Sequence, residues 1–215
     1  MYIVYHGNYF NVILSLKFKT MKNTTFFAAA GLALALFSCG GAEGNTEKTT
    51  FKLDTEASSL SWKGSKSATY AHTGMVGIKE GSIEMEGDKL VGGTFVIDMN
   101  DITVSDKDLP ADKKEMLAGH LKDTSFFFAA KHPNITVKVN GYENGKLDAV
   151  VNILGQDMKQ SIPVTMKVTE KDATISGKFT MDVATLKLAG MEPDPKSGEK
   201  IQSKIEFELD LKLKK

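Results

Sequence analysis

The stretch KIEFELDLKLK, residues 204–214, alternates apolar and charged side chains without interruption. Its apolar members stand at every second position, and they are Ile205, Phe207, Leu209, Leu211 and Leu213. Glutamate, aspartate and lysine fill the positions between them. Because successive side chains of a β-strand point to opposite faces of a sheet, this pattern predicts a strand with one apolar face and one solvent-exposed face.

The same period of two recurs through most of the chain upstream of this stretch, for example in Ile135, Val137 and Val139. Short turn signals separate the alternating runs. The dipeptide Asn144-Gly145 favours a type I′ hairpin, because both central residues of that turn need a positive φ. Short connections favour antiparallel pairing of neighbours in sequence.

These runs, with residues 51–55 counted as a first strand, predict an all-β fold. We expect eight antiparallel strands that close into a barrel over residues 49–215, which removes exposed strand edges. A barrel of this size is either filled by its own side chains or holds one small ligand. The alternation shows which face is apolar, and it leaves both alternatives open.

One helical segment interrupts the strands. Asp112 and Glu115 have the spacing of a capping box, and four residues after them are expected to share one face: Met116, Leu117, His120 and Leu121. Pro133 limits the helix, because the residue before a proline is pushed away from helical geometry. Three consecutive phenylalanines, residues 126–128, lie in the same insertion. Its apolar face must be buried, so we expect it to line or close one open end of the barrel.

The amino-terminal region reads as an export signal. Residues 21–38 hold a lysine, an apolar run of signal-peptide length and a small residue, directly before Cys39. The apolar run is too short for a bilayer span of about 20 residues. The sequence LFSC at 36–39 resembles the lipobox of bacterial lipoproteins, in which the cysteine is acylated after cleavage. A buried core helix is the alternative interpretation of this run.

The lipoprotein interpretation divides the chain as follows. Residues 1–20 are an upstream extension before a start at Met21, or else an unusually long charged region of the signal. Residues 39–48 are a polar, glycine-rich flexible tether. Acyl chains on Cys39 would anchor the protein to a membrane without spanning it. We therefore expect a protein of the cell envelope that faces the periplasm or the cell surface.

Charge and composition exclude several classes of partner. The formal net charge is zero, and all 27 basic residues are lysines. Nucleic-acid binders depend on neutralising phosphates, so nucleic acid is not expected as a partner. Without arginine, the bidentate forks that bind phosphate or carboxylate are missing.

Several motifs in order along the chain resemble those of the YceI-like family. They are Trp62, His72-Thr73-Gly74, Gly92-Gly93 before Phe95, His120-Leu121-Lys122, Phe126-Phe127 and Lys131-His132-Pro133. The resemblance runs from about residue 51 to residue 213. Members of this family are exported, lipocalin-like barrels that bind polyisoprenoids or other long amphiphiles. The chain departs from the family at Phe128, where a polar or acidic residue is usual, and at residues 183–186, which lack a basic residue.

The resemblance implies a barrel cavity that takes an isoprenoid chain or a similar amphiphilic lipid. The residues expected to bind it are Trp62, His72, Phe95, Ile97, Met99, His120, Phe126, Phe127, Phe179 and Met181. The loop at residues 190–200 is either a lid over the cavity or a plain connector. The resemblance implies no other cofactor.

Catalysis and metal binding are the weaker interpretations. No nucleophile with a base and an orienting group is recognisable, so we expect no enzyme and assign no catalytic residue. His72, His120 and His132 could form a three-histidine metal site, but no pair has the i, i+4 spacing. The acidic residues at 98–108 lack the glycine and glutamate of a calcium loop, and we interpret them as a solvated strand end.

Three functions follow from these interpretations. The first is an envelope lipoprotein that carries, stores or sequesters a polyisoprenoid or similar amphiphile. The second is a ligand-free barrel that acts as an envelope stress or protein-interaction module. The third is an enzyme that acts on a bound isoprenoid through a histidine. The sequence makes no prediction about the oligomeric state.

Overall fold

In the computed structural model of the protein, the alternating stretch at the end of the chain forms strand β10 (Lys204–Lys214). It pairs along its whole length with β9 (Asp172–Asp182). Ile205, Leu209 and Leu213 of β10 are buried, as the alternation predicts. The structure describes residues 47–67, 69–193, 195–196 and 198–215.

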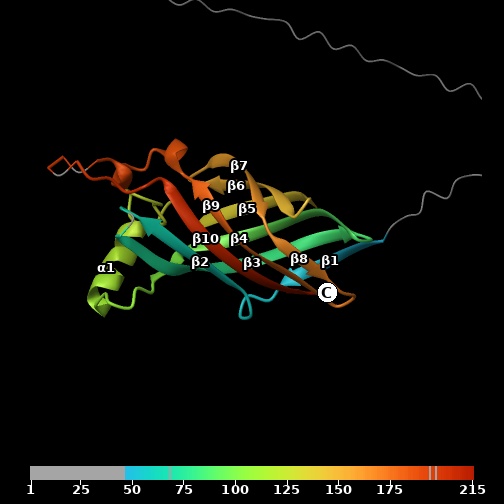
Figure 1. Ribbon diagram of the computed structural model, residues 1–215. Helices are drawn as coiled ribbons and strands as arrows, with labels where there is room; N and C mark the ends of the chain where they lie inside the picture. The colour runs from blue at the N-terminus through green and yellow to red at the C-terminus, as the bar shows by residue number, and fades with distance from the viewer. Residues whose placement is uncertain (1–46, 68, 194, 197) are drawn as a thin grey trace, which may run out of the picture. The chain divides into compact units, whose positions relative to one another are not determined.

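The other strands form one antiparallel sheet with β9 and β10 (Figure 1). They are β1 (Lys48–Leu53), β2 (Ser59–Ser65), β3 (Ala71–Glu86), β4 (Lys89–Val104), β5 (Asn134–Glu143), β6 (Lys146–Ile153), β7 (Gln156–Pro163) and β8 (Thr165–Val168). The spatial order is β7-β6-β5-β4-β3-β1-β10-β9-β8, and β2 pairs with β3 and β10. The all-β, antiparallel class predicted from the sequence is confirmed.

The expected count of eight strands is wrong, because the described residues form ten. Two places around the sheet are each occupied by two successive strands. β1 and β2 both lie between β3 and β10, with a turn at residues 54–58 between them. β7 and β8 follow one another across Val164. A break of one residue leaves a period of two unchanged, so the sequence pattern does not reveal it.

The sheet closes into a barrel at Val164. Before this residue the chain pairs with β6, and after it the chain pairs with β9. The Val164 N–H donates to the carbonyl of Gly145 at 2.9 Å. A Cβ on Gly177 of β9 would lie 2.4 Å from the Pro163 carbonyl oxygen, so only glycine permits this approach. Beyond this closing corner, no ladder joins β7 to β9 among the described residues.

The turn predicted at Asn144-Gly145 is confirmed. The φ angles are 51° at Asn144 and 76° at Gly145, which is the left-handed region that a type I′ turn requires. The next hairpin, between β6 and β7, repeats the geometry with Leu154 at 53° and Gly155 at 78°. Leucine rarely adopts a positive φ, so the sequence did not indicate that Leu154 occupies the first central position of this second turn.

One end of the barrel is packed by its own side chains. Met85 and Leu90 flank the turn between β3 and β4, and each is 2% exposed. Ile83, Ile175 and Leu213 are equally inaccessible. Helix α1 follows the opposite end of β4, so this packed end lies away from the helix (Figure 1).

Helix α1 (Ala111–Lys122) differs from its prediction in two details. It begins with Pro110 at the N-cap and forms no side-chain cap bond, so the expected capping box is wrong. Met116 is 63% exposed, whereas Leu117 and Leu121 pack against the core. Two 3₁₀ turns, η1 (Ala184–Leu186) and η2 (Ala189–Met191), lie between β9 and β10. Crossing a bilayer takes a longer and more apolar helix than any in the described part of the chain.

Candidate functional site

A cavity of about 300 Å³ lies inside the barrel, and α1 and the turn after it form part of its wall. Several inward-facing apolar side chains are only half-buried, because they face this cavity and no other side chain covers them. They are Ile78, Ile97, Ile135, Val137, Phe179 and Phe207. The deeply buried Ile83, Met85 and Leu90 are absent from the cavity wall. The barrel is therefore solid at one end and hollow at the other.

All ten residues that the sequence predicts for the ligand site lie on the wall of this cavity. They are Trp62, His72, Phe95, Ile97, Met99, His120, Phe126, Phe127, Phe179 and Met181. Alternation on β4 and β9 places five of them there, and β2, β3, α1 and the turn after α1 supply the others. Their contact with a ligand remains a prediction.

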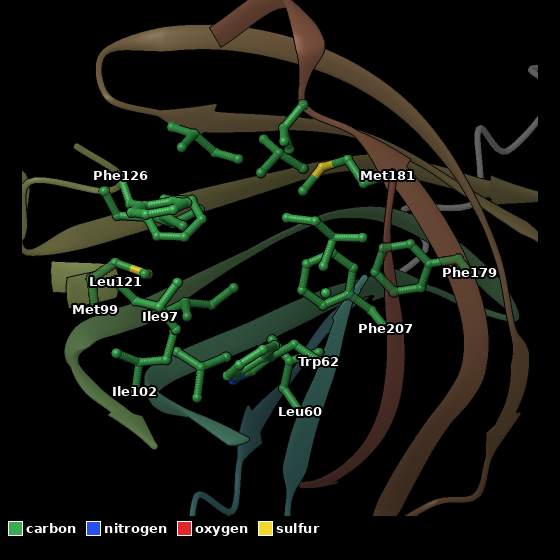
Figure 2. Close-up of a pocket in the computed structure, with 18 of the residues that line it drawn as sticks. Leu60, Trp62, Ile97, Met99, Ile102, Leu121, Phe126, Phe179, Met181 and Phe207 are labelled. Carbon is green, nitrogen blue, oxygen red and sulfur yellow. The ribbon is translucent and has the colours of Figure 1, made fainter. Parts of the chain in front are cut away.

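Three aromatic rings follow one another across neighbouring strands. Phe207 of β10 is in register with Phe179 of β9 on one side and with Trp62 of β2 on the other. The two phenylalanine rings are stacked at 5.3 Å, and the Trp62 indole N–H donates to the Met75 carbonyl at 3.3 Å. Figure 2 shows these side chains pointing from separate strands into the same space. The aromatic row gives one wall of the cavity a rigid apolar surface.

The three consecutive phenylalanines divide between two environments. Phe126 is 5% exposed and Phe127 is half-buried, and both line the cavity. Phe128 lies outside the cavity wall and packs edge-on against the ring of His132, with centroids 6.2 Å apart. Its φ of 42° is unusual for a bulky residue. The expectation that the insertion lines an end of the barrel is therefore confirmed for the first two rings.

We define the strap as the described residues between β9 and β10, which are 183–193, 195–196 and 198–203. Its Gly190 N–H donates to the Ser125 carbonyl at 2.7 Å. A Cβ on Gly190 would lie 2.3 Å from the ring of Phe126, so glycine lets the strap rest directly on that ring. Met191 and Ile201 line the cavity. The strap is thus part of the wall, and a role as a lid remains a prediction.

The cavity reaches the surface at the α1 end, which we call the mouth. Exposed or half-exposed residues line it there, among them Tyr70 and His120. The His120 Nδ1 lies 2.7 Å from an Asp123 carboxylate oxygen, and its ring meets Phe126 edge-on at 5.0 Å. Lys66 forms an ion pair with Glu199 at 2.7 Å.

A second histidine–aspartate pair lies where β3 begins. The His72 Nδ1 is 2.5 Å from one oxygen of Asp106, whose other oxygen accepts hydrogen bonds from the Thr73 N–H and hydroxyl. Both side chains are largely buried, at 24% and 18% exposed. Burial acts to raise the pKa of Asp106, but the hydrogen bonds from His72 and Thr73 prevail and hold the pKa below its ordinary value.

Sequence reasoning missed several members of the site. Asp106 was interpreted as part of a solvated strand end, because nothing local connects it with His72, 34 positions earlier. Tyr70 and Gln202 also line the mouth without any recognisable motif. Phe207, however, belongs to the alternating stretch that predicts β10, and the signal for placing it on the inner face was present.

The other expectations fall outside this site. Among the described residues, no three His, Cys, Asp or Glu side chains are grouped closely enough to hold a metal ion. The predicted extension, signal peptide and lipidated Cys39 lie outside the described residues, as does the tether up to residue 46. β1 begins at Lys48, the last residue of the expected tether.

Comparison with known proteins gives one family and several solved structures. A family model described as the YceI-like domain matches residues 51–213. A search of curated proteins found no match.

Two solved structures are similar to this chain. One is a polyisoprenoid binding domain from Saccharophagus degradans implicated in plant cell wall breakdown, at 17% identity and a TM-score of 0.58. It covers 76% of this chain and 97% of that domain. The other is BcnA from Burkholderia cenocepacia, at 14% identity and a TM-score of 0.56, covering 74% of this chain and 98% of BcnA. At these identities the likeness shows the fold alone.

Proposed function

Because the chain belongs to the YceI-like family, we propose that it binds a polyisoprenoid or a similar long-chain amphiphile inside its barrel. The observation that carries this proposal is the apolar hollow of about 300 Å³ that opens beside α1. Pockets that bind small molecules range from about 300 to 1,000 Å³, so this one has room for a substantial part of a hydrocarbon chain. Each buried methylene would contribute about 0.8 kcal/mol.

The kind of chain is suggested by the wall and by one structural relative. The wall combines aromatic rings with branched aliphatic side chains and the flexible thioethers of Met99 and Met181. Such a surface suits a long apolar molecule that enters with some freedom of conformation. The Saccharophagus degradans domain of similar fold is described as polyisoprenoid-binding, which supports the isoprenoid class by analogy of fold.

The proposed cellular role is that of an exported lipoprotein that carries, stores or sequesters this lipid at the cell envelope. Its support is the sequence of residues 21–39, which has the order of a lipoprotein signal. Two or more acyl chains at Cys39 would hold the protein stably at a membrane. We propose binding rather than catalysis, and no other cofactor.

The test of ligand binding uses the full chain, purified from bacterial envelopes. We expect organic extraction followed by mass spectrometry to recover a long-chain lipid in near-stoichiometric amount. Trp62 is the only tryptophan of the chain and lines the cavity, so its fluorescence should report rebinding of that lipid to the extracted protein. An empty barrel whose Trp62 fluorescence is insensitive to added lipid would contradict the proposal and favour the protein-interaction alternative.

The test of anchoring is separate. We expect the mature protein to begin at Cys39, to carry the added mass of acyl chains and to sediment with membranes. Cys39→Ala should release it into the soluble fraction without changing lipid binding by the barrel. An unacylated Cys39 in the mature wild-type protein would refute the anchor and leave the binding proposal intact.

A further inference from the structure

The polar lining of the cavity is confined to its mouth. Within the described part of the chain, the lining residues with polar side chains besides Trp62 are Ser65, Lys66, Tyr70, His72, His120 and Gln202. They come from the end of β2, the turn between β2 and β3, the start of β3, α1 and the strap, all at the open end. The deeper wall is apolar. A chain that enters tail first would therefore leave its polar head among these six side chains.

His72 is the most firmly positioned of them. Asp106 holds its Nδ1 at 2.5 Å and is itself fixed by two hydrogen bonds from Thr73. Because the pKa of Asp106 is lowered, the carboxyl group is ionised at neutral pH and can only accept. The Nδ1 of His72 must then be the donor, and its Nε2 has no hydrogen-bond partner among the described residues. In a neutral imidazole with Nδ1 protonated, Nε2 is an acceptor.

The charges at the mouth disfavour an anionic head. Lys66 is neutralised by Glu199, and His120 stands beside the carboxylate of Asp123. With Asp106 next to His72, every basic side chain on the cavity wall already has a carboxylate partner. Among the residues that the structure describes on the cavity wall, a phosphate or carboxylate placed here would meet three carboxylates and no unmatched cation. An uncharged group that donates a hydrogen bond meets no such penalty.

We propose that the mouth selects a neutral hydroxyl head, as in a prenyl alcohol, whose O–H donates to the Nε2 of His72. The inference rests on the proposed function, since it assigns the head of the chain that the cavity would hold. His72 contacts the ligand, and Asp106 is a positioning residue that fixes which nitrogen of the ring is the acceptor. The remaining mouth residues surround the head without contributing net positive charge.

The test compares three ligands with the same isoprenoid chain: geranylgeraniol, its methyl ether and its monophosphate. Binding to the lipid-extracted full chain is followed through Trp62 fluorescence. The ether keeps the oxygen but cannot donate a hydrogen bond, so we expect it to bind up to about tenfold more weakly than the alcohol. The monophosphate should also bind more weakly than the alcohol, because of the surrounding carboxylates.

Variants then assign the preference to the proposed pair. His72→Phe should bind alcohol and ether equally, and Asp106→Asn should reduce the alcohol-to-ether ratio without loss of ether binding. His132→Phe is the matched control, because that ring lies outside the cavity wall, and it should keep the wild-type ratio. The wild-type comparison needs no variant, so it decides the question even where a substitution impairs folding.

The outcomes separate this inference from the proposed function. Equal binding of alcohol and ether by the wild type would overturn the hydroxyl subsite and leave chain binding standing. Tightest binding of the monophosphate would overturn it in favour of an anionic head. An unchanged alcohol preference in folded His72→Phe would remove His72 from the contact. Failure of all three ligands to bind would refute the proposed function, and the inference with it.

Discussion

At the mouth of the cavity, single glycines decide how closely neighbouring segments approach. Gly190 lets the strap rest on the Phe126 ring, and Gly74 lets β3 pass against the indole of Trp62, where a Cβ would lie 2.6 Å from the ring. These contacts shape the aromatic part of the wall. A glycine at such a place is required for the space it leaves rather than for an unusual φ.

We expect Gly190→Ala to destabilise the protein by about 1–3 kcal/mol, because the added methyl group meets a buried ring that must move. Urea unfolding measures the change in the free energy of unfolding. Gly119→Ala is the control, since Gly119 lies in α1 and nothing beyond its chain neighbours and the adjacent helix backbone lies within 4 Å of the place its methyl group would take. That helical substitution should stabilise by up to about 1 kcal/mol. Effects of the same sign in both variants would refute this account of Gly190.

The sequence predicted well which face of a strand each side chain occupies. It predicted poorly which residues distant in sequence contact one another. Alternation alone placed Phe95, Ile97 and Phe179 on the inner face, because a period of two fixes the face of each strand residue. The partnership of His72 with Asp106 depends on how β3 and the segment after β4 meet, 34 positions apart. No local pattern carries that information.

At the scale of elements, the barrel depends on how its first and last ladders meet. The closing corner at Val164 is formed by β7 and β8, where β9 comes close enough only through Gly177. Period-two patterning did not separate β7 from β8, because both segments keep the same alternation. Together with the division between β1 and β2, this makes ten strands in the places expected for eight.

We expect Gly177→Ala to weaken the closing corner by about 1–3 kcal/mol, because its methyl group would meet the backbone carbonyl of Pro163, which cannot rotate away. Hydrogen exchange should show faster exchange of the β8 amides that pair with β9. Gly92→Ala on β4 is the strand control, since its nearest atoms lie at ordinary contact distance, 3.8 Å or more. Unchanged exchange in β8 would show that the corner tolerates a side chain.

At the scale of the molecule, the barrel combines a packed end with a cavity, and a matched pair of substitutions should distinguish the two. Ile97→Trp adds volume where the wall faces the cavity, so we expect little loss of stability and strongly reduced lipid binding. Ile83→Trp adds the same volume at a site that is 0% exposed and off the cavity wall. Overpacking there should cost about 1–3 kcal/mol or more.

Thermal unfolding and lipid titration of both variants measure these effects. Equal destabilisation by the two substitutions would show that the space in front of Ile97 is filled in solution. The sequence predicted the apolar inner face but could not decide between filling and hollow, because both use the same residue types at the same period. Whether the barrel is filled or hollow depends on the total volume of the inward-facing side chains compared with the space that the closed sheet encloses. Both quantities are properties of the assembled barrel.

The stability of the whole molecule should fall in acid. Hydrogen bonds lower the pKa of three aspartates outside the cavity: Asp54 through Lys214, Asp123 through the Ser125 N–H, and Asp182 through the Ala184 N–H. Asp106 is lowered as well. Because each pKa is lower in the folded state than the ordinary 3.8, the unfolded chain binds protons first as the pH falls.

The contribution of these carboxylates is therefore present above about pH 4 and is lost progressively below it. We expect the urea midpoint to be nearly constant from pH 6 to pH 8 and to decrease below about pH 4. Asp106→Asn should be less stable than the wild type at neutral pH and should lose less on acidification. An identical acid dependence of the two proteins would show that Asp106 takes no part in it.

The end of the barrel beside Met85 and Leu90 is packed, so a chain that enters the cavity at the mouth cannot pass out through that end. The packed end limits how far the tail of a bound molecule can enter. The part of the chain that is longer than the cavity therefore remains outside the barrel. A bound chain would then leave the cavity through the mouth, past Phe126 and the strap. The protein would then distinguish between lipids by the length of the chain rather than by the chemistry of its tail end.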